Sequence, residues 1–215
     1  MFVIPVHNIE GGDYNIGHQM LFQTPLFDIN IEDIDNRKLE NDLYDLKNED
    51  IDGGRYSNIG GWHSKPINSN NIKSKEDIDK LKIFTPIIEK LPKILPRLPF
   101  DPIITNIENI GIWANISGKG NFNTPHSHPE CDISGVYYVK IPEEKSGEIC
   151  FYDPRQSLSF GNRLVVNRYV GGNSTFRYPK EGLMFLFPSS FEHMVKPNET
   201  DEDRISISFN LNLRW

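Results

Sequence analysis

Apolar residues follow two different spacings in the two halves of the chain. Before about residue 100 they recur at intervals of three or four, as on one side of a helix. After about residue 102 the chain consists of short runs rich in β-branched and aromatic residues, separated by Gly, Pro, Asn or charged residues. The pattern therefore predicts helices in the first half and strands in the second.

Two helical regions are predicted. The first begins near Asn36, a candidate cap, and places Leu39, Leu43 and Leu46 on one side. Between the two regions lies the Gly-rich segment DGGRYSNIGGWHSK, which forms either a connector or the wall of a pocket.

The second region begins where Ser74 and Asp77 resemble a capping box. Pro86 lies inside it and predicts a kink or a break into two short helices, and Pro92 and Pro96 are expected to end it. Its apolar positions recur near helical spacing: Ile78, Leu81, Phe84, Ile88 and Leu91.

The second half predicts an antiparallel sandwich or barrel, because its strand-like runs follow one another without a helix between them. A double-sheet jelly roll, mainly β with flanking helices, is the expected fold. We find no internal repeat or linker and expect a single domain over 1–215, with 1–100 as a helical and loop-rich buttress and 101–215 as the β core. The predicted strands are ITNIENIGIWANIS, CDISGVYYVKI, GEICFYDP, RLVVNRYVG, GLMFLFPS and RISISFNLNLRW.

Charge and composition narrow the choice of function. The 215 residues carry a net charge of -7, which disfavours general attraction to nucleic acid. The chain has no signal-peptide pattern and no apolar run long enough to span a membrane, so we expect a cytoplasmic protein without a membrane partner. Its two cysteines, Cys131 and Cys150, are expected to be reduced thiols. The sequence leaves the oligomeric state open.

The segment NFNTPHSHPECD is the main candidate for chemistry. In an extended strand, alternate side chains share a face, so His126, His128 and Glu130 would point the same way. The only later histidine, His193, follows a run that predicts a buried strand and a turn. Ligands two residues apart on a strand, with a third from elsewhere, suit an iron site that leaves positions open for substrate and oxygen.

Arg204 begins the last predicted strand. If it points inward, so do Ser206, Ser208 and Asn210. A guanidinium inside a barrel requires an anionic partner, and a carboxylate is its best geometric match. That carboxylate would come either from the chain or from a ligand.

Together, His126-x-His128, SGVYYVKIP, His193 and Arg204 resemble the iron(II)- and 2-oxoglutarate-dependent oxygenases, which have a double-stranded β-helix fold of the jelly-roll, cupin-like kind. A closer resemblance is to a bacterial and phage group of such oxygenases of unassigned substrate, through FQTPLF, GRYSNIGGWHSK, H-x-HP, FPSSFEHMVKP and RISISFN. The resemblance implies that Arg204 and Tyr138 hold the distal carboxylate of 2-oxoglutarate. It also implies that Asn115 contacts this co-substrate, and Ser206 is a candidate helper.

The sequence departs from the wider superfamily at one position. Register with the prolyl hydroxylases places His128 where that superfamily has Asp or Glu, so His126, His128 and His193 would be the metal ligands. If the register slides by two, His128, Glu130 and His193 restore a two-histidine, one-carboxylate triad. We favour the three-histidine set, because the closer group shows H-x-HP.

The resemblance implies an enzyme that uses Fe(II), 2-oxoglutarate and O2 to hydroxylate an unidentified substrate, with release of succinate and CO2. One alternative is a three-histidine, thiol-oxidising dioxygenase, but it gives no reason for Arg204. Another is a non-catalytic jelly-roll binding module.

Several other residues are weaker candidates. Arg55, Tyr56, Trp62 and Trp113 could line a substrate cleft, although packing roles are more common for such residues. Arg155 could meet an anionic substrate, although a surface ion pair is the more common role. The remaining histidines lack a partner at ligand spacing and are expected on the surface: His7, His18 and His63.

Overall fold

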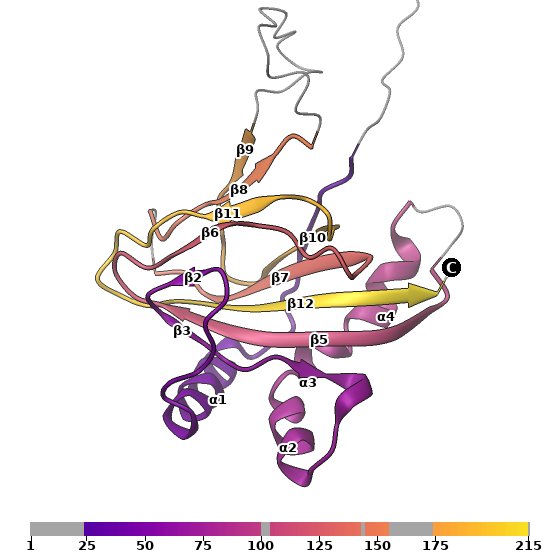
Figure 1. The fold of residues 1–215 in the computed structure, drawn as a ribbon, viewed down its shortest axis with the longest axis horizontal. Coiled ribbons are helices and arrows are strands. Elements are labelled where there is room, and N and C mark those ends of the chain that lie inside the picture. The colour runs from indigo at the N-terminus through magenta and orange to yellow at the C-terminus, as the bar shows by residue number, and fades with distance from the viewer. Residues whose placement is uncertain (1–23, 100–103, 143–144, 155–173, 215) are drawn as a thin grey trace, which may run out of the picture.

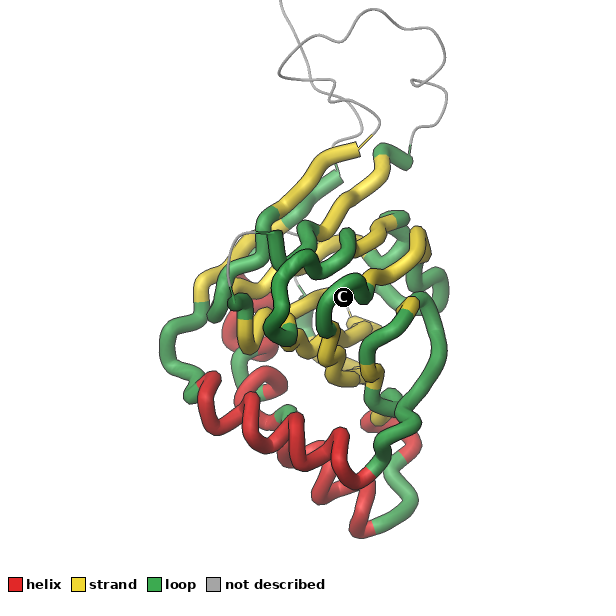
Figure 2. The backbone as a smooth tube through the Cα atoms, turned by 90° about the vertical axis from the view of Figure 1, so that its left-hand side faces the viewer, coloured by secondary structure: helices red, strands yellow, loops and turns green. Residues whose placement is uncertain are grey.

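The structure is a computed structural model that describes residues 24–99, 104–142, 145–154 and 174–214. It contains two antiparallel sheets that lie one above the other, with helices beneath the larger sheet (Figure 1). Most of the helical residues lie on one side of the strands (Figure 2). The predicted fold, mainly β with flanking helices and arranged as a jelly roll, is confirmed.

The larger sheet has seven strands in the order β1-β10-β7-β12-β5-β3, with β4 also paired to β5. Its longest pairing joins β5 to β12 along nearly their full length. These strands span Phe27–Asn30 (β1), Trp62–His63 (β3), Ile67–Asn68 (β4), Asn106–Ser117 (β5), Ile133–Lys140 (β7), Leu183–Pro188 (β10) and Arg204–Arg214 (β12).

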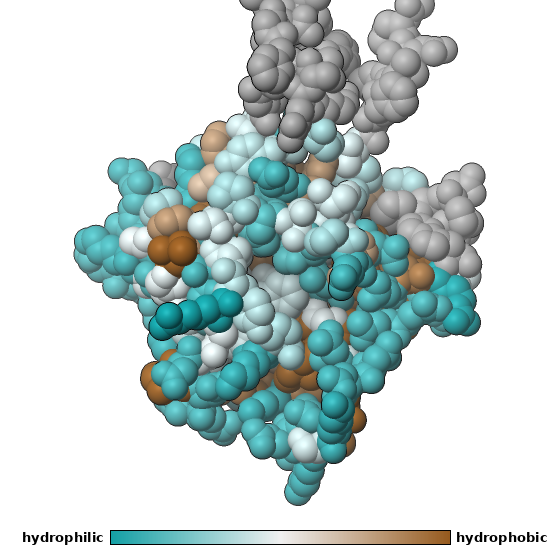
Figure 3. Space-filling view, viewed as in Figure 1, coloured by the Kyte–Doolittle hydropathy of each residue, from teal (hydrophilic) through white to brown (hydrophobic). Residues whose placement is uncertain are grey.

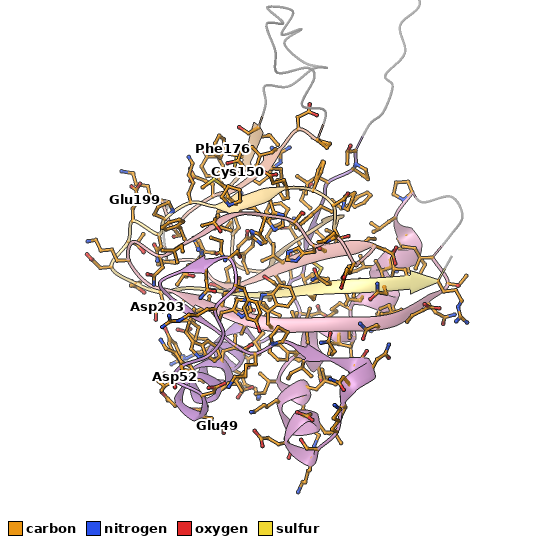
Figure 4. All side chains as sticks on the ribbon, in the orientation of Figure 1. Glu49, Asp52, Cys150, Phe176, Glu199 and Asp203 are labelled. Atoms are coloured by element: carbon orange, nitrogen blue, oxygen red, sulfur yellow. The ribbon has the colours of Figure 1, made fainter. Side chains whose placement is uncertain are left out.

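The smaller sheet has five strands in the order β2-β6-β11-β8-β9. They span Asn58–Ile59 (β2), Phe122–His126 (β6), Ile149–Tyr152 (β8), Ser174–Arg177 (β9) and His193–Val195 (β11). Next to one edge of this sheet, Cys150 of β8 is the register partner of Phe176 of the edge strand β9, and both are labelled in Figure 4. Cys150 and Cys131 are free thiols, as expected.

The helices are α1 (Asn36–Glu49), α2 (Lys75–Ile83), α3 (Thr85–Ile88) and α4 (Leu91–Ile94), with short 3-10 turns η1 (Ser69–Asn71) and η2 (Leu95–Arg97). Helix α1 buries the three leucines that the pattern selected. Its cap is Asp35 rather than Asn36, because the Asp35 side chain accepts the backbone N–H of Lys38. Tyr44 of α1 donates a 2.9 Å hydrogen bond to Asp203, which precedes β12 and is labelled in Figure 4.

The second helical region is broken, as Pro86 predicted. Ser74 and Asp77 form the expected capping box at the start of α2. Pro86 lies in the first turn of α3, where a missing backbone N–H costs nothing. The prediction that Pro92 and Pro96 end the helix was wrong for the same reason: Pro92 lies in the first turn of α4 and Pro96 in that of η2.

Strand β12 shows how the sheet divides its side chains between two environments. Ile205, Ile207 and Leu211 join the core between the larger sheet and the helices. The alternate residues from Arg204 to Asn210 face the other sheet and line a cavity. A smaller core lies between the sheets and contains Tyr138, Phe185 and Phe187.

The predicted strands correspond to β5, β7, β8, β10 and β12, and the run RLVVNRYVG lies outside the described residues. One predicted extent was wrong: β6 ends at His126, so His128 and Glu130 follow the strand rather than continue it. Among the described residues, no helix is long and apolar enough to cross a membrane.

Candidate metal centre and cavity

The structure brings His126, His128 and His193 together. Their candidate ligand atoms all lie within 4.8 Å of one another. The ring centroids of His126 and His193 are 4.3 Å apart, and that of His128 lies 5.1 Å from His126 and 5.4 Å from His193. Imidazole nitrogens at this spacing are suited to sharing a metal ion.

Pairing within the smaller sheet explains this convergence. His193 begins β11 and is the direct register partner of His126 at the end of β6. His128 lies beyond β6, but its backbone N–H donates to Ser189 at 2.8 Å, which fixes the loop next to the end of β10. The cluster therefore depends on two strand ends and one tethered loop, not on a continuous H-x-H strand.

Two of the histidines are oriented by backbone hydrogen bonds. The Nδ1 of His126 lies 2.7 Å from the carbonyl of Thr124, and the Nδ1 of His193 lies 2.8 Å from that of Phe191. Because a carbonyl only accepts, each Nδ1 carries the proton and each Nε2 keeps a lone pair. The Nε2 of His126 also lies 3.3 Å from the hydroxyl of Ser57.

Burial keeps the cluster neutral. Burial, together with a smaller effect of the nearby His126, lowers the pKa of His128 to about 4 and that of His193 to about 3. Burial also lowers the pKa of His126. At neutral pH all three rings therefore retain the lone pairs that a metal ion requires.

Glu130 lies elsewhere. It is exposed, does not belong to the histidine cluster, and its backbone carbonyl accepts a hydrogen bond from Asn212. The geometry therefore favours the three-histidine set over the alternative in which Glu130 replaces His126.

A cavity of about 410 Å³ adjoins the histidines. Its floor is the inner face of the larger sheet, where four residues of β12 alternate with residues of the apolar core. We call these four the inner row: Arg204, Ser206, Ser208 and Asn210. The cavity falls in the size range of typical ligand sites.

Arg204 lies at one end of the inner row and is 3% exposed. Its Nη1 donates to three backbone carbonyls, those of Ser146 at 2.5 Å, Gly147 at 3.4 Å and Lys196 at 3.3 Å. Among the described residues, no carboxylate forms an ion pair with it, and its other nitrogens make no hydrogen bond. Burial lowers the pKa of Arg204, but a guanidinium remains charged.

Tyr138 approaches the same end from β7. Its side chain is 2% exposed, and its hydroxyl makes no hydrogen bond to another described residue. Because no buried side-chain polar atom of the described part lacks a partner, this hydroxyl must reach the cavity. Burial raises the pKa of Tyr138, and the hydroxyl therefore stays protonated as a donor.

Asn115 and Ser206 also line the cavity. They are direct register partners on β5 and β12. The amide of Asn115 donates to the hydroxyl of Ser208 at 3.1 Å, which orients its oxygen. The structure therefore brings all seven residues selected from the sequence to one cavity.

His63 was wrongly expected on the surface. It is 5% exposed, lines the cavity, and stacks on Trp113 with ring centroids 5.6 Å apart and an interplanar angle of 14°. Burial lowers its pKa to about 4. The strand β3 carries His63 against β5, and this long-range pairing cannot be inferred from ligand spacing.

The Gly-rich loop contributes unequally to the cavity. Tyr56 lines it, with its ring 4.5 Å from His63, and Trp113 on β5 lines it as well. Trp62 instead packs in the core and donates to the carbonyl of Asp50 at 2.7 Å. Arg55 is exposed and does not line the cavity. His7, His18 and Arg155 lie outside the described residues.

The sequence reasoning missed Gly147. Its φ is +94°, and a Cβ at this position would lie 2.2 Å from Nη1 of Arg204 and 2.3 Å from the carbonyl oxygen of Lys196. Only glycine allows the backbone this close to the guanidinium. The signal in the sequence was a glycine in the turn between two predicted strands, but nothing local indicated that an arginine lay beside it.

Solved structures share this architecture at low sequence identity. A prolyl-4-hydroxylase from Pseudomonas putida matches with a TM-score of 0.56 and 13% identity, covering 89% of this chain and 94% of its own. A Trichoplax adhaerens prolyl hydroxylase, solved with a hypoxia inducible factor peptide fragment, matches with a TM-score of 0.57 and 13% identity, covering 87% of this chain and 83% of its own. The carbocyclase SnoK of nogalamycin biosynthesis is described as non-heme and alpha ketoglutarate dependent. It matches with a TM-score of 0.59 and 8% identity, covering 88% of this chain and 80% of its own.

These similarities define the fold class, the double-stranded β-helix of the 2-oxoglutarate oxygenases. In the sequence, residues 111–210, a little under half of the chain, match a family model described as "Putative 2OG-Fe(II) oxygenase". The expected resemblance to that family is thereby confirmed. No curated protein matches the chain.

The family match also bears on cofactors. Proteins of this family use Fe(II), 2-oxoglutarate and O2, which agrees with the cofactors expected from the sequence and with the histidine cluster. The matches support an oxygenase, and a small-molecule co-substrate is in keeping with the family. They do not fix the reaction, since the similar structures include both hydroxylases and a carbocyclase.

Proposed function

We propose that this chain is an Fe(II)- and 2-oxoglutarate-dependent oxygenase that hydroxylates its substrate. In this proposal His126, His128 and His193 hold the metal, and Arg204 and Tyr138 hold the distal carboxylate of 2-oxoglutarate. The balanced reaction consumes a substrate C–H bond, 2-oxoglutarate and O2, and yields the alcohol, succinate and CO2.

One observation carries the proposal. A buried guanidinium, bonded only to backbone carbonyls among the described residues, shares a cavity with three converging imidazoles. An unpaired buried charge is unfavourable unless a ligand neutralises it. A dicarboxylate that reaches from the metal to Arg204 would supply that charge, and a structural metal site alone would not require it.

The residues present suit the metal. Three neutral imidazoles, two of them oriented by their own backbone carbonyls, form a donor set for a borderline divalent ion. Protein ligands from one side leave the cavity side open. When bound there, iron(II) with 2-oxoglutarate supplies the activation of O2 that oxidises a substrate C–H bond.

The protein's own groups position the co-substrate. Arg204 can donate from its unused nitrogens to a carboxylate in a planar, two-point contact. Tyr138 remains protonated and can donate a further hydrogen bond to the same group. Ser206 is the register partner of Asn115 and of Tyr138, and both Ser206 and Asn115 line the cavity, where they can contact the rest of the molecule.

Buried apolar side chains also line the cavity. Ile149 and Phe187 line it and are 2% and 3% exposed. A site with little water strengthens the interaction between the guanidinium and a carboxylate. No side chain needs to act as a general acid or base in this scheme, because the chemistry belongs to the cofactors.

The proposal is tested by metal binding. Purified without oxygen, the protein should bind one Fe(II) per chain, and His193→Ala should abolish that binding. His63→Ala is the matched control, since His63 is also a buried cavity histidine but lies outside the cluster. With Fe(II) and O2 supplied, the intact protein should convert 2-oxoglutarate to succinate. Stoichiometric iron retained in His193→Ala would refute the metal assignment.

A further inference from the structure

The inner row divides the cavity into two ends. Arg204 marks the co-substrate end and Asn210 the opposite one, about 20 Å apart along β12 at roughly 3.3 Å per residue. The cavity extends past Asn210 to residues of three other strands, β4, β5 and β7. We call this the amide end, defined by Asn68, Asn109, Trp113, Ser134, Ser208, Asn210 and His63.

Charge is distributed unevenly between the two ends. Arg204 is the only Lys, Arg, Asp or Glu among the described residues that line the cavity. The amide end contains only uncharged groups, since burial holds the pKa of His63 at about 4. A charged group placed there would lose its hydration without gaining a partner of opposite sign, which is unfavourable.

The polar groups of the amide end are not fully used within the protein. Asn210 accepts from the hydroxyl of Ser134 at 2.7 Å, but its own NH2 group donates to no described residue. The indole N–H of Trp113 likewise makes no hydrogen bond within the described part and, because it is not buried, is open to the cavity. These two groups provide donors for a ligand.

His63 provides the complementary acceptor. Its Nδ1 lies 2.6 Å from the carbonyl of Ser64 and therefore carries the proton, which leaves a lone pair on Nε2. Its ring is held between Tyr56 and Trp113, with centroids at 4.5 Å and 5.6 Å. Trp113 in turn lies 5.8 Å from His128, so this wall adjoins the candidate metal ligands.

The face of the molecule in Figure 3 is mainly hydrophilic, with apolar residues in separate patches. Specificity for the substrate is then expected inside the cavity, from fixed donors and acceptors, more than from a broad apolar surface on this face.

We propose that the amide end binds the substrate and selects an uncharged group of the amide class, which both donates and accepts hydrogen bonds. Asn210 and Trp113 donate to it, and His63 accepts from it. This inference rests on the proposed function, which it deepens by naming the substrate class. Such a group occurs both in amides of peptide type and in heterocyclic lactams.

Matched probes test the charge requirement. The protein, loaded with Zn(II) and 2-oxoglutarate so that no turnover occurs, is examined by ligand-observed NMR. One arm compares N-acetyl-leucinamide, which is uncharged, with leucine, a zwitterion, and leucinamide, a cation. The other compares uracil with orotate, its carboxylate. The uncharged member of each arm should bind at least tenfold more tightly, which corresponds to about 1.4 kcal/mol. The arm with the tighter uncharged probe identifies the source, peptide or heterocycle.

A variant that adds a charge to the amide end tests the site through a change in the ratio of two probe affinities, whatever the affinity of the unmodified protein for either probe. Asn210→Asp places a carboxylate at the amide end and should shift the ratio of leucinamide to N-acetyl-leucinamide affinity at least tenfold towards the cation. Asn106→Asp is the matched control, because it makes the same change at an exposed position of β5 outside the cavity. That control should leave the ratio unchanged.

A second variant tests the acceptor. His63→Phe keeps a ring against Trp113 but removes Nε2, and it should weaken binding of the preferred uncharged probe about tenfold while leaving metal binding intact. Unchanged affinity in His63→Phe would remove His63 from the site.

The outcomes separate this inference from the proposed function. If Zn(II) and 2-oxoglutarate bind but charged probes bind as tightly as uncharged ones, or no uncharged probe binds at millimolar concentration, the amide-class assignment is wrong and the oxygenase proposal stands. If the metal or 2-oxoglutarate itself fails to bind, the proposed function is wrong, and the substrate assignment fails with it.

Discussion

The two faces of the larger sheet serve different purposes although they share the same strands. On β12 the outward residues Ile205, Ile207 and Leu211 are fully buried against the helices. The inward residues run from a guanidinium through two hydroxyls to an amide. One face stabilises the fold by apolar burial, and the other holds polar groups in fixed positions at some cost in stability. Substitutions on the two faces should therefore have separable effects.

The largest effect on stability is expected on the outer face. Ile207→Ala removes a side chain with no exposed surface from the helix-backed core. Denaturant unfolding should show a loss of about 2 to 5 kcal/mol, the usual result of such a truncation. The dissociation constant for 2-oxoglutarate, measured where the variant is folded, should stay close to that of the unmodified protein. A large change in that constant would mean that the two faces are not independent.

The matching substitution on the inner face is at Arg204, three residues earlier on the same strand. Arg204→Ala should weaken 2-oxoglutarate binding by about 2 to 5 kcal/mol, as expected on truncating one member of a buried charge pair. Titration calorimetry measures this directly. Arg214→Ala is the control, since Arg214 is an exposed residue of β12 that pairs with Glu108. Equal affinity in the two variants would remove Arg204 from the site.

A smaller effect is expected at Gly147, which lies beside Arg204. Gly147→Ala and Gly120→Ala both place a side chain at positive φ, so both should lose about 1 to 3 kcal/mol of stability through strain. Only at Gly147 would the new Cβ collide with the guanidinium, because nothing lies within 4 Å of a Cβ at Gly120. Calorimetry should therefore show weaker 2-oxoglutarate binding in Gly147→Ala alone. Equal binding in both would show that the guanidinium does not depend on this close approach.

The smallest effect is expected at Glu130. Because its side chain is exposed and outside the histidine cluster, Glu130→Ala should leave the affinity for Fe(II) nearly unchanged in an anaerobic titration. A collapse of affinity would instead show that the carboxylate moves into the metal site, and that the inner cavity is less rigid than its hydrogen bonds suggest.

The sequence anticipated much of this arrangement where the signal was local. The alternation of polar and apolar residues in RISISFN predicted which side chains of β12 share a face with Arg204, and the structure places Arg204, Ser206, Ser208 and Asn210 along one cavity. The capping box at Ser74 and the break at Pro86 were likewise local. Tyr138, Asn115 and the co-substrate role of Arg204 came from a family resemblance, whose ordered motifs carry long-range information that periodicity alone lacks.

Other features could not be predicted from local pattern. The prediction that His63 lies on the surface was wrong, because its burial depends on pairing between β3 and β5, which are far apart in the chain. The prediction that one strand continues from His126 to His128 was wrong, because the loop after β6 is fixed by a hydrogen bond to Ser189, which follows β10. Nothing local indicated that Gly147 lies beside Arg204, because Gly147 precedes β8 and Arg204 begins β12, far along the chain.

The amino-acid sequence by itself determined helices α1 and α2, the strands β5, β7, β8, β10 and β12, and which β12 side chains share a face, because backbone geometry sets a period of two in any extended segment. It did not indicate the short strands β1 to β4 of the first half. Tertiary structure alone decided which strands became neighbours. It placed His193 opposite His126, His63 against Trp113, and Arg204 within reach of the cavity. Register between distant strands depends on burial and hydrogen bonding across the whole sheet, which no single segment of the chain specifies.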